Sequence, residues 1–189
     1  AWSPNGEKLA VGYDDGTVEI RNLQANINTT IGQSAVPIIS MAWNPTNIDQ
    51  LAVLTITGVL RVYDVQSGNS LYRDELDANS PVYISWSPDG TRLATADNDI
   101  AGQYQPPGAV TILDAQNGQI IDRFVEHQYI VTQVVWNPVD SNLLASTSLD
   151  SYTFIWDVST GQVLQRFFNR FGGISVGWNP DGTQLATLG

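Results

Sequence analysis

Apolar and polar residues alternate along most of this chain, in short runs that end at glycine, proline, aspartate or asparagine. The runs Val82-Tyr83-Ile84-Ser85-Trp86 and Thr153-Phe154-Ile155-Trp156 show the two-residue period of β-strands, whose successive side chains point to opposite faces of a sheet. The i, i+3, i+4, i+7 pattern of an amphipathic helix does not occur over any useful length. The pattern therefore predicts an all-β chain.

A Trp-(Ser/Asn)-Pro tripeptide interrupts these strands five times, with its tryptophan at Trp2, Trp43, Trp86, Trp136 and Trp178. The intervals are 41, 43, 50 and 42 residues, and three of the four match the 40 to 45 residues of a propeller blade. Each tripeptide precedes a Leu-Ala pair, and the first four are followed by a second turn, an alternating strand and usually a third turn with glycine. A four-stranded unit of this size is apolar on both faces, so we expect the units to stack around a common axis.

The sequence thus predicts a β-propeller, with about four to five four-stranded antiparallel blades in this chain. We place a partial blade at 1–34, complete blades at 35–78, 79–127 and 128–170, and a second partial blade at 171–189. The strands of the complete blades are expected near residues 37–44, 50–56, 59–64, 70–76, 81–87, 91–97, 109–114, 119–125, 130–136, 142–148, 152–157 and 162–168.

The segment Ile155-Trp156-Asp157-Val158, with Thr160-Gly161 after it, resembles the signature of the WD-repeat family. The resemblance covers essentially the whole chain, although the repeats are divergent and Tyr63-Asp64 or Leu113-Asp114 stands at the related positions of other units. It implies a hydrogen-bonded structural tetrad, which carried over by position consists of His127, Ser146, Asp150 and Trp156. Glu126 precedes the histidine, where the family often has glycine.

The resemblance also implies a closed ring, usually of seven blades, which would need roughly 290 residues at this spacing. An open arc would leave unpaired strand edges and uncovered apolar faces. We therefore expect this chain to be a segment of a longer propeller, whose remaining blades come from the rest of the chain or from another chain. Ala1 opens the sequence without methionine, so we also expect the natural N-terminus and any targeting signal to lie outside it.

Composition narrows the classes of partner. The formal net charge is −11, from 19 acidic and 8 basic residues, and such a chain repels the phosphate backbone of nucleic acids. There is no cysteine and no apolar run of the roughly 18 residues that a membrane helix needs. We expect a soluble protein that does not insert into membranes. A cytoplasmic location is slightly favoured over secretion, and the sequon Asn28-Thr29-Thr30 matters only in a secreted eukaryotic protein.

Residues with catalytic potential have simpler explanations. His127 is the single histidine and could in principle be a base or a metal ligand, but we interpret it as a tetrad member. Asp97 and Asp99 are spaced like the opening of a calcium loop, yet the glycine and glutamate that such a loop needs are missing, so turn chemistry explains them. We expect no catalytic, cofactor-binding or metal-binding residues.

Partner binding is expected at loops on one rim of the propeller, because binding residues concentrate on loops held by a rigid scaffold. The long third interval contains an insert at 98–108, which offers Gln103, Tyr104 and Gln105. Further candidates on the same rim are Tyr129, Tyr152, Arg170 and Phe171, since aromatic residues and arginine are common interface anchors. The alternatives are that the insert is a tolerated surface insertion and that the aromatic residues belong to the blade core.

These observations favour a non-catalytic WD-repeat scaffold that mediates protein–protein interactions through its rim loops. One alternative is a structural or assembly subunit of a larger complex. A less favoured alternative is a carbohydrate-acting or carbohydrate-binding propeller, with carboxylates near the central channel.

Overall fold

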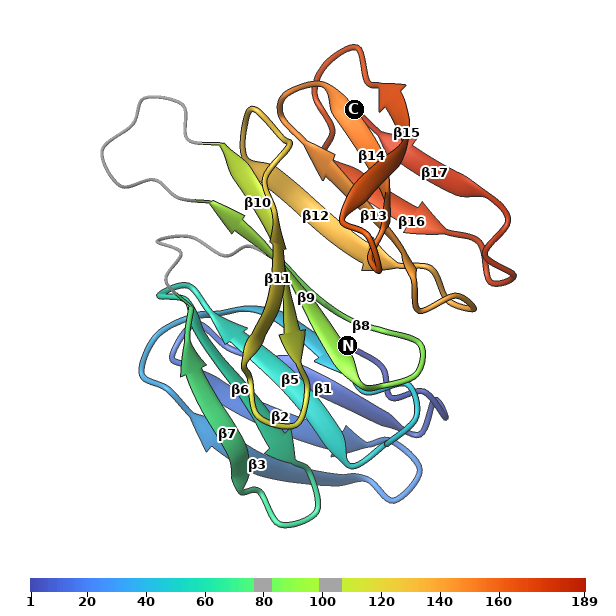
Figure 1. Ribbon diagram of the computed structural model, residues 1–189. Coiled ribbons are helices and arrows are strands. Elements are labelled where there is room, and N and C mark those ends of the chain that lie inside the picture. Colours follow the sequence, from blue (N-terminus) through green and yellow to red (C-terminus); the bar gives the residue numbers. More distant parts are fainter. Residues whose placement is uncertain (77–82, 99–106) are drawn as a thin grey trace.

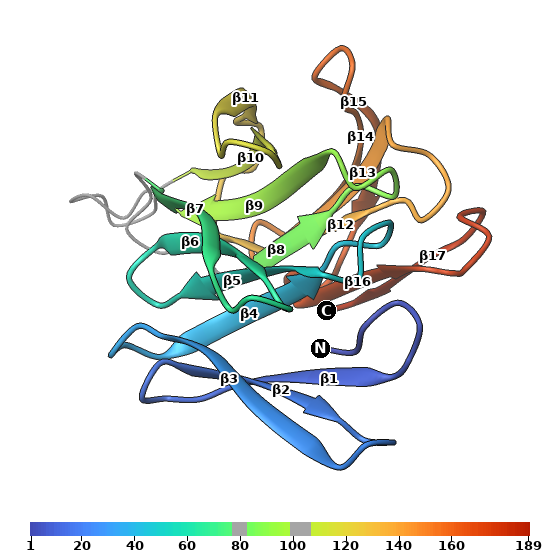
Figure 2. The ribbon, with the colours of Figure 1, turned by 90° about the horizontal axis from the view of Figure 1, so that it is seen from below.

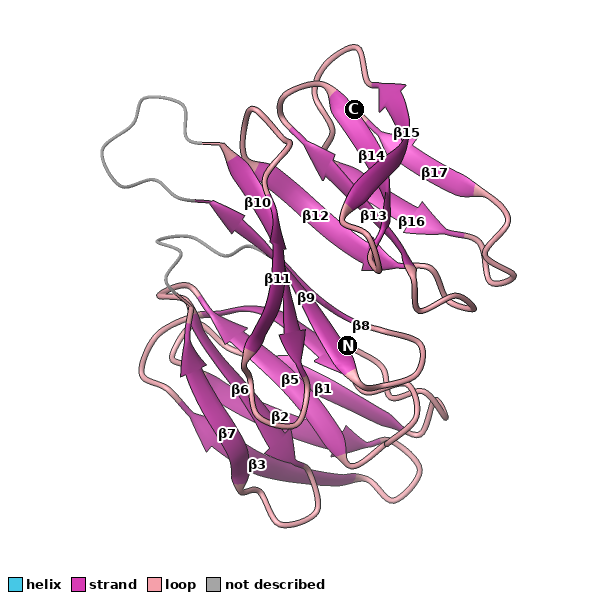
Figure 3. Ribbon diagram, in the orientation of Figure 1, coloured by secondary structure: helices cyan, strands magenta, loops and turns pink. Residues whose placement is uncertain are grey.

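The computed structural model of this 189-residue chain describes residues 1–76, 83–98 and 107–189. Within these ranges all regular structure is β-strand, and the strands form five antiparallel sheets in succession along the chain (Figure 1, Figure 3). The strands of each sheet lie in chain order, so every strand pairs with its neighbours in sequence. The all-β prediction is confirmed.

The first and fifth sheets are partial, with three and two strands, and the other three sheets have four strands each. The first sheet consists of β1 (Lys8–Gly12), β2 (Thr17–Asn22) and β3 (Ile27–Gln33). The second consists of β4 (Ile38–Trp43), β5 (Gln50–Thr55), β6 (Val59–Asp64) and β7 (Ser70–Glu75). The third consists of β8 (Tyr83–Trp86), β9 (Arg92–Asn98), β10 (Gly108–Asp114) and β11 (Ile120–Phe124). The fourth consists of β12 (Val131–Trp136), β13 (Leu143–Ser148), β14 (Tyr152–Asp157) and β15 (Gln162–Phe168), and the fifth of β16 (Ser175–Trp178) and β17 (Leu185–Leu188).

One type of turn joins the third and fourth strands of each complete sheet. In the fourth sheet, Asp157 Oδ1 accepts a hydrogen bond from the Ser159 amide at 2.9 Å, and the Gly161 amide donates to the Asp157 carbonyl at 2.8 Å. Gly161 has a φ of 69°, a conformation that residues with a side chain disfavour. The equivalent pairs are Asp64 with Gly68 and Asp114 with Gly118. Local turn chemistry therefore explains why the strands end where they do.

Apolar side chains between the first four sheets form three clusters, so each of the first three sheets covers a face of the next. The cluster between the third and fourth sheets contains the fully buried Trp156 and Leu144 together with Phe124 and Phe154. Burial of one such side chain contributes about 1.5–3 kcal/mol. Figure 2 shows the sheets as successive layers that fan out from their first strands, which is the stacking of propeller blades that the sequence predicts.

The tryptophans of the Trp-(Ser/Asn)-Pro turns link each sheet to the one before it. In three of them the indole Nε1–H donates to the carbonyl oxygen of the residue that precedes the previous tryptophan of this series: Trp43 to Ala1 at 3.0 Å, Trp86 to Ala42 at 2.8 Å and Trp178 to Val135 at 3.4 Å. Trp136 is different, because its buried Nε1 has no hydrogen-bond partner among the described residues. Instead, the guanidinium of Arg92 in the third sheet lies over its ring, 4.9 Å from the centroid.

Connections between strands alternate between two ends of the sheets, because successive strands run antiparallel. One end, which we call the turn end, carries the Trp-(Ser/Asn)-Pro turns and the aspartate–glycine turns. The other end, which we call the loop end, carries the connections between second and third strands and those that lead from one sheet to the next. Asn98 at the end of β9 and Gly108 at the start of β10 lie at the loop end, whereas residues 99–106 of the predicted insert lie outside the described residues.

Candidate partner-binding surface

The four residues of the predicted tetrad are brought together in the fourth sheet, in a network that runs from its loop end into its interior. Trp156 Nε1–H donates to Ser146 Oγ at 2.7 Å. The two ring nitrogens of His127 lie 2.8 Å from Ser146 Oγ and 2.8 Å from Asp150 Oδ2. The His127 ring also stacks on Phe154, with 4.1 Å between centroids. The network thus joins the segment before β12 to β13, to β14 and to the turn between these two strands.

Each polar side chain of this network has a partner inside it. Ser146 Oγ accepts from the Trp156 indole and also bonds one ring nitrogen of His127, while the other ring nitrogen bonds Asp150. Serine, histidine and aspartate are also the residue types of a hydrolytic triad. Here Ser146 has no exposed surface and His127 is 1% exposed, so this serine as placed cannot reach a substrate.

Asp150 anchors the turn between β13 and β14. Besides His127, its carboxylate accepts hydrogen bonds from the backbone amides of Gln128 and Tyr152, each at 2.9 Å. Burial opposes ionisation of this carboxyl, but the hydrogen bonds and the charge interaction with His127 outweigh it, so the pKa of Asp150 lies below its ordinary value. The ionised carboxylate therefore holds two loop-end segments in one arrangement.

The predicted rim candidates differ in how accessible they are. Phe171 is 76% exposed and Tyr152 is 40% exposed, and the guanidinium of Arg170 lies over the Phe171 ring at 5.3 Å from its centroid. Tyr129 is half-buried, and its carbonyl oxygen accepts a hydrogen bond from Ser148 Oγ at 3.0 Å. The other three candidates, Gln103, Tyr104 and Gln105, lie outside the described residues.

Two further exposed apolar residues, which the sequence analysis did not single out, lie beside these candidates. Phe168 is 68% exposed and contacts Tyr152 edge-to-face, with 5.8 Å between ring centroids. Leu149 is 46% exposed, and Gly172 lies beside it, since a Cβ atom on Gly172 would be in ordinary van der Waals contact with the Leu149 side chain at 3.6 Å. The signal for Leu149 was a leucine at the tip of a tight turn, where burial is not expected. We call Leu149, Tyr152, Phe168 and Phe171 the rim patch.

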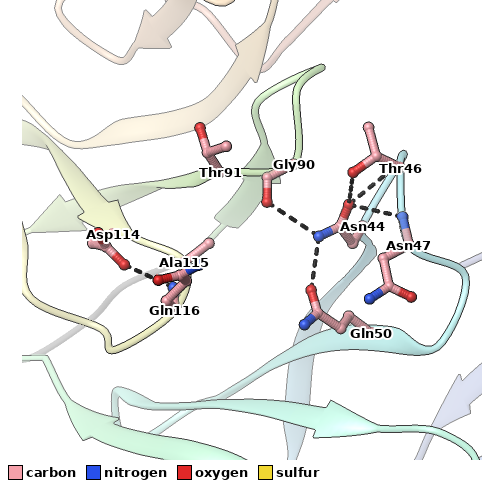
Figure 4. Close-up of a pocket in the computed structure, with 9 residues that line it drawn as sticks. All are labelled: Asn44, Thr46, Asn47, Gln50, Gly90, Thr91, Asp114, Ala115 and Gln116. Atoms are coloured by element: carbon pink, nitrogen blue, oxygen red, sulfur yellow. Dashed lines mark hydrogen bonds between the residues drawn. The ribbon is translucent and has the colours of Figure 1, made fainter.

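A pocket of about 430 Å³ opens at the turn end, between the second and third sheets (Figure 4). Its lining residues are Asn44, Thr46, Asn47, Gln50, Gly90, Thr91, Asp114, Ala115 and Gln116. Asn44 is buried and holds the two sheets together, because its Nδ2 donates to Gln50 Oε1 at 2.8 Å and to the Gly90 carbonyl at 3.2 Å. This pocket lies at the opposite end of the sheets from the rim patch.

The described residues contain no group of three or more histidine, cysteine, aspartate or glutamate side chains that could hold a metal ion. Nor do residues 1–76, 83–98 and 107–189 include a helix long and apolar enough to cross a membrane.

Comparison with known proteins places this architecture among repeat proteins. The family profile "WD domain, G-beta repeat" matches residues 1–22 and 118–157. THO complex subunit 3 of Arabidopsis thaliana is 26% identical over 79% of this chain and 46% of its own length. WD repeat-containing protein slp1 of Schizosaccharomyces pombe is 27% identical over 97% of this chain and 36% of its own length. Human WD repeat-containing protein 36 is 25% identical over 96% of this chain and 20% of its own length.

A solved structure agrees with the fold. A chain of a structure titled "Crystal Structure of Mitotic Checkpoint Complex" superposes with a TM-score of 0.85 and 23% identity, over 99% of this chain and 55% of that one. The chain thus spans between a fifth and about half of the length of these relatives.

Proposed function

Because the chain belongs to the WD-repeat family, we propose that it is a non-catalytic scaffold that binds a protein partner at the loop end of its fourth and fifth sheets. The observation that carries this proposal is the rim patch of Leu149, Tyr152, Phe168 and Phe171, all of which are exposed. Apolar surface of this kind is stabilised when a partner removes it from water.

Aromatic residues in the rim patch have the character of interface anchors. Tyr152 is supported on one side by Phe154, at 6.0 Å between centroids, and on the other by Phe168. Phe171 carries the Arg170 guanidinium over its ring, and arginine and aromatic residues dominate the binding energy of many interfaces. Rings that are already held in place lose little conformational entropy on binding, which favours affinity.

The buried network below the patch supports this arrangement. Asp150 fixes the amide of Tyr152, and the turn that contains Asp150 also carries Leu149. His127 and Ser146 tie this turn to the interior of the sheet. We therefore assign His127, Ser146, Asp150 and Trp156 a structural role, which is to hold the rim patch in one shape.

The names of the relatives agree with a partner-binding role. One of them is a subunit of a complex, THO complex subunit 3. The same name favours a second candidate function, in which this chain is a permanent assembly subunit and its rim patch is always covered.

A photo-crosslinking amino acid in place of Phe171, in the full-length protein, tests the proposal. Ile120 is the control position, because it is 57% exposed and lies on β11 in another sheet. We expect a crosslinked partner from position 171 and none from position 120. Alanine at Tyr152 and Phe171 together should then weaken the isolated complex at least about tenfold, which corresponds to about 1.4 kcal/mol.

Crosslinking that is equal at the two positions would contradict the proposal. A complex that survives dilution and purification at fixed stoichiometry would identify the permanent assembly subunit instead.

A further inference from the structure

The turn-end pocket lies where three turns meet. Asn44 and Gln50 flank it on the second sheet, Gly90 and Thr91 on the third, and Asp114 begins the turn that completes its wall (Figure 4). Asn44 satisfies its own hydrogen bonds within this wall, as described above, so the groups that remain available to a ligand lie on its neighbours.

Gln50 occupies a position that recurs in every sheet. In the ladder between the second and third strands of a complete sheet it pairs with Asp64, while Arg92 pairs with Asp114. In the first sheet the equivalent residue is Lys8, which pairs with Asn22. In the fourth sheet the equivalent residue is Leu143, which pairs with Asp157. Lys8 and Arg92, in the sheets on either side of Gln50, therefore carry a cation at this position, whereas Gln50 and Leu143 are neutral.

Both cations reach across to the following sheet. Lys8 Nζ lies 3.9 Å from Asp49 Oδ1 of the second sheet. Arg92 Nη2 donates to the carbonyl oxygen of Ser141, 2.5 Å away in the turn between β12 and β13 of the fourth sheet, and its guanidinium lies over the Trp136 ring. At the joint between the second and third sheets, Gln50 instead accepts a hydrogen bond from Asn44, which also links the two sheets through Gly90, and the pocket of about 430 Å³ lies beside this link.

The geometry points to a binding site for a cation at this joint: we propose that the pocket receives a lysine or arginine side chain from a partner polypeptide. The incoming cation takes the place that Lys8 and Arg92 fill at the flanking joints. The partner's chain continues away from the pocket over the turn end, where its lining residues lie.

The groups around the pocket suit a donor-rich, positively charged ligand. Asp114 is its one charged lining residue, and only Oδ1 of this carboxylate is engaged, with the amides of Gln116 and Asn117 at 2.7 and 3.3 Å. Among the described residues, Asp114 Oδ2 and the Gln116 side chain have no hydrogen-bond partner. A carboxylate oxygen and an amide oxygen are acceptors for an ammonium or guanidinium group, which has only donors.

Other ligand classes fit less well. An anion would face the Asp114 carboxylate, the one charged group that lines the pocket. A sugar would find no aromatic side chain to stack on, because none lines the pocket. The formal net charge of −11 also attracts a basic partner over long range and speeds its encounter.

Two short peptides test the proposal on the full-length protein: acetyl-Gly-Arg-Gly-amide and the same peptide with neutral citrulline in place of arginine. Binding is followed by nuclear magnetic resonance, through the side-chain amide signals of Asn47, Gln50 and Gln116. We expect the arginine peptide to shift these signals and to bind at least about tenfold more tightly than the citrulline peptide.

Two matched pairs of variants locate the site. Asp114→Asn keeps the Oδ1 acceptor of its turn but removes the charge, and we expect it to weaken the arginine peptide about tenfold. Asp157→Asn makes the same change at the equivalent turn of the next sheet, away from the pocket, and should leave binding unchanged. Gln50→Lys supplies the cation from within and should abolish binding, whereas Gln50→Met, of similar length but neutral, should retain it.

Equal affinity for the two peptides, or an equal effect of Asp114→Asn and Asp157→Asn, would overturn the proposal. The comparison of the peptides needs no variant, so it decides the question even where a substitution disturbs folding. Alanine at Tyr152 and Phe171 should not change peptide binding, because these residues lie at the loop end. The outcome is thus independent of whether the rim patch binds a partner.

Discussion

Asn137 Nδ2 donates a hydrogen bond to the carbonyl oxygen of Gly182, 2.8 Å away in the turn of the next sheet. Asn44 makes the same bond to Gly90 one pair of sheets earlier, at 3.2 Å. The first and second sheets are linked by Lys8 instead, and the third and fourth by Arg92. Along the turn end of this chain, links made by an asparagine amide and links made by a cation therefore alternate.

Replacement of Asn137 by alanine should lower the free energy of unfolding by about 2–3 kcal/mol. The residue is 1% exposed, and its Oδ1 also accepts the backbone amides of Val139 and Asp140, so buried polar groups would lose their partner. Urea unfolding followed by tryptophan fluorescence measures this loss. Asn179→Ala is the control, because Asn179 bonds only within its own turn; a loss as large as that of Asn137→Ala would argue against a role for the bond between sheets.

Substitution of Ser146 by alanine should destabilise the protein by about 2–4 kcal/mol, because it leaves the buried Trp156 Nε1–H and one nitrogen of His127 without a partner. Chemical denaturation again provides the measurement. Ser159→Ala, in an exposed turn, should change stability by no more than about 0.5–1 kcal/mol. Similar losses for the two variants would show that the network contributes little.

The stability of the fourth sheet should depend on pH through Asp150. Its folded pKa lies below the ordinary value of 3.8, because its hydrogen bonds and the charge interaction with His127 outweigh the burial that opposes ionisation. The stabilisation is therefore present above about pH 4 and is lost as the pH falls through the lower, folded pKa. Unfolding free energies measured between pH 6 and 2 should decline less steeply in Asp150→Asn than in the natural sequence. Parallel curves would contradict this assignment.

Two tryptophans that look alike in the sequence should respond differently to replacement by phenylalanine. Trp86→Phe removes the hydrogen bond to the Ala42 carbonyl and should cost about 1 kcal/mol more than Trp136→Phe, whose Nε1–H has no partner among the described residues. Both rings are at least 94% buried, so the loss of packing is comparable. Thermal unfolding of the two variants side by side checks this order, and a larger loss for Trp136→Phe would contradict it.

Local signals predicted the strands closely. The strand expected at 37–44 is β4, Ile38–Trp43, and the one expected at 152–157 is β14, with the same limits. Both follow from alternation and from turn residues such as the aspartate of Asp157 and the glycine of Gly161, whose conformational preferences act within a few residues. The four tetrad positions came from the resemblance to a known repeat, and the structure brings their side chains into contact.

Contacts between sheets could not be predicted in the same way. Nothing near Leu149 in the chain indicates that Gly172 will pack beside it, and the importance of Gln50 appears only when its register is compared with that of Lys8 and Arg92. These relationships join residues more than 20 positions apart, and they depend on how one twisted sheet packs on the next.

The sequence by itself determined that this chain forms short antiparallel strands in repeating units, because the two-residue period and the aspartate–glycine turns act locally. Only the tertiary structure decided which residues of different units meet. It left aromatic rings exposed at the loop end and opened the pocket beside Gln50, and it gave the Nε1–H of Trp136 no hydrogen-bond partner among the described residues. The physical reason is that stacking buries the apolar faces of whole sheets, and the accessibility and partners of each polar group follow from that packing rather than from its neighbours in the chain.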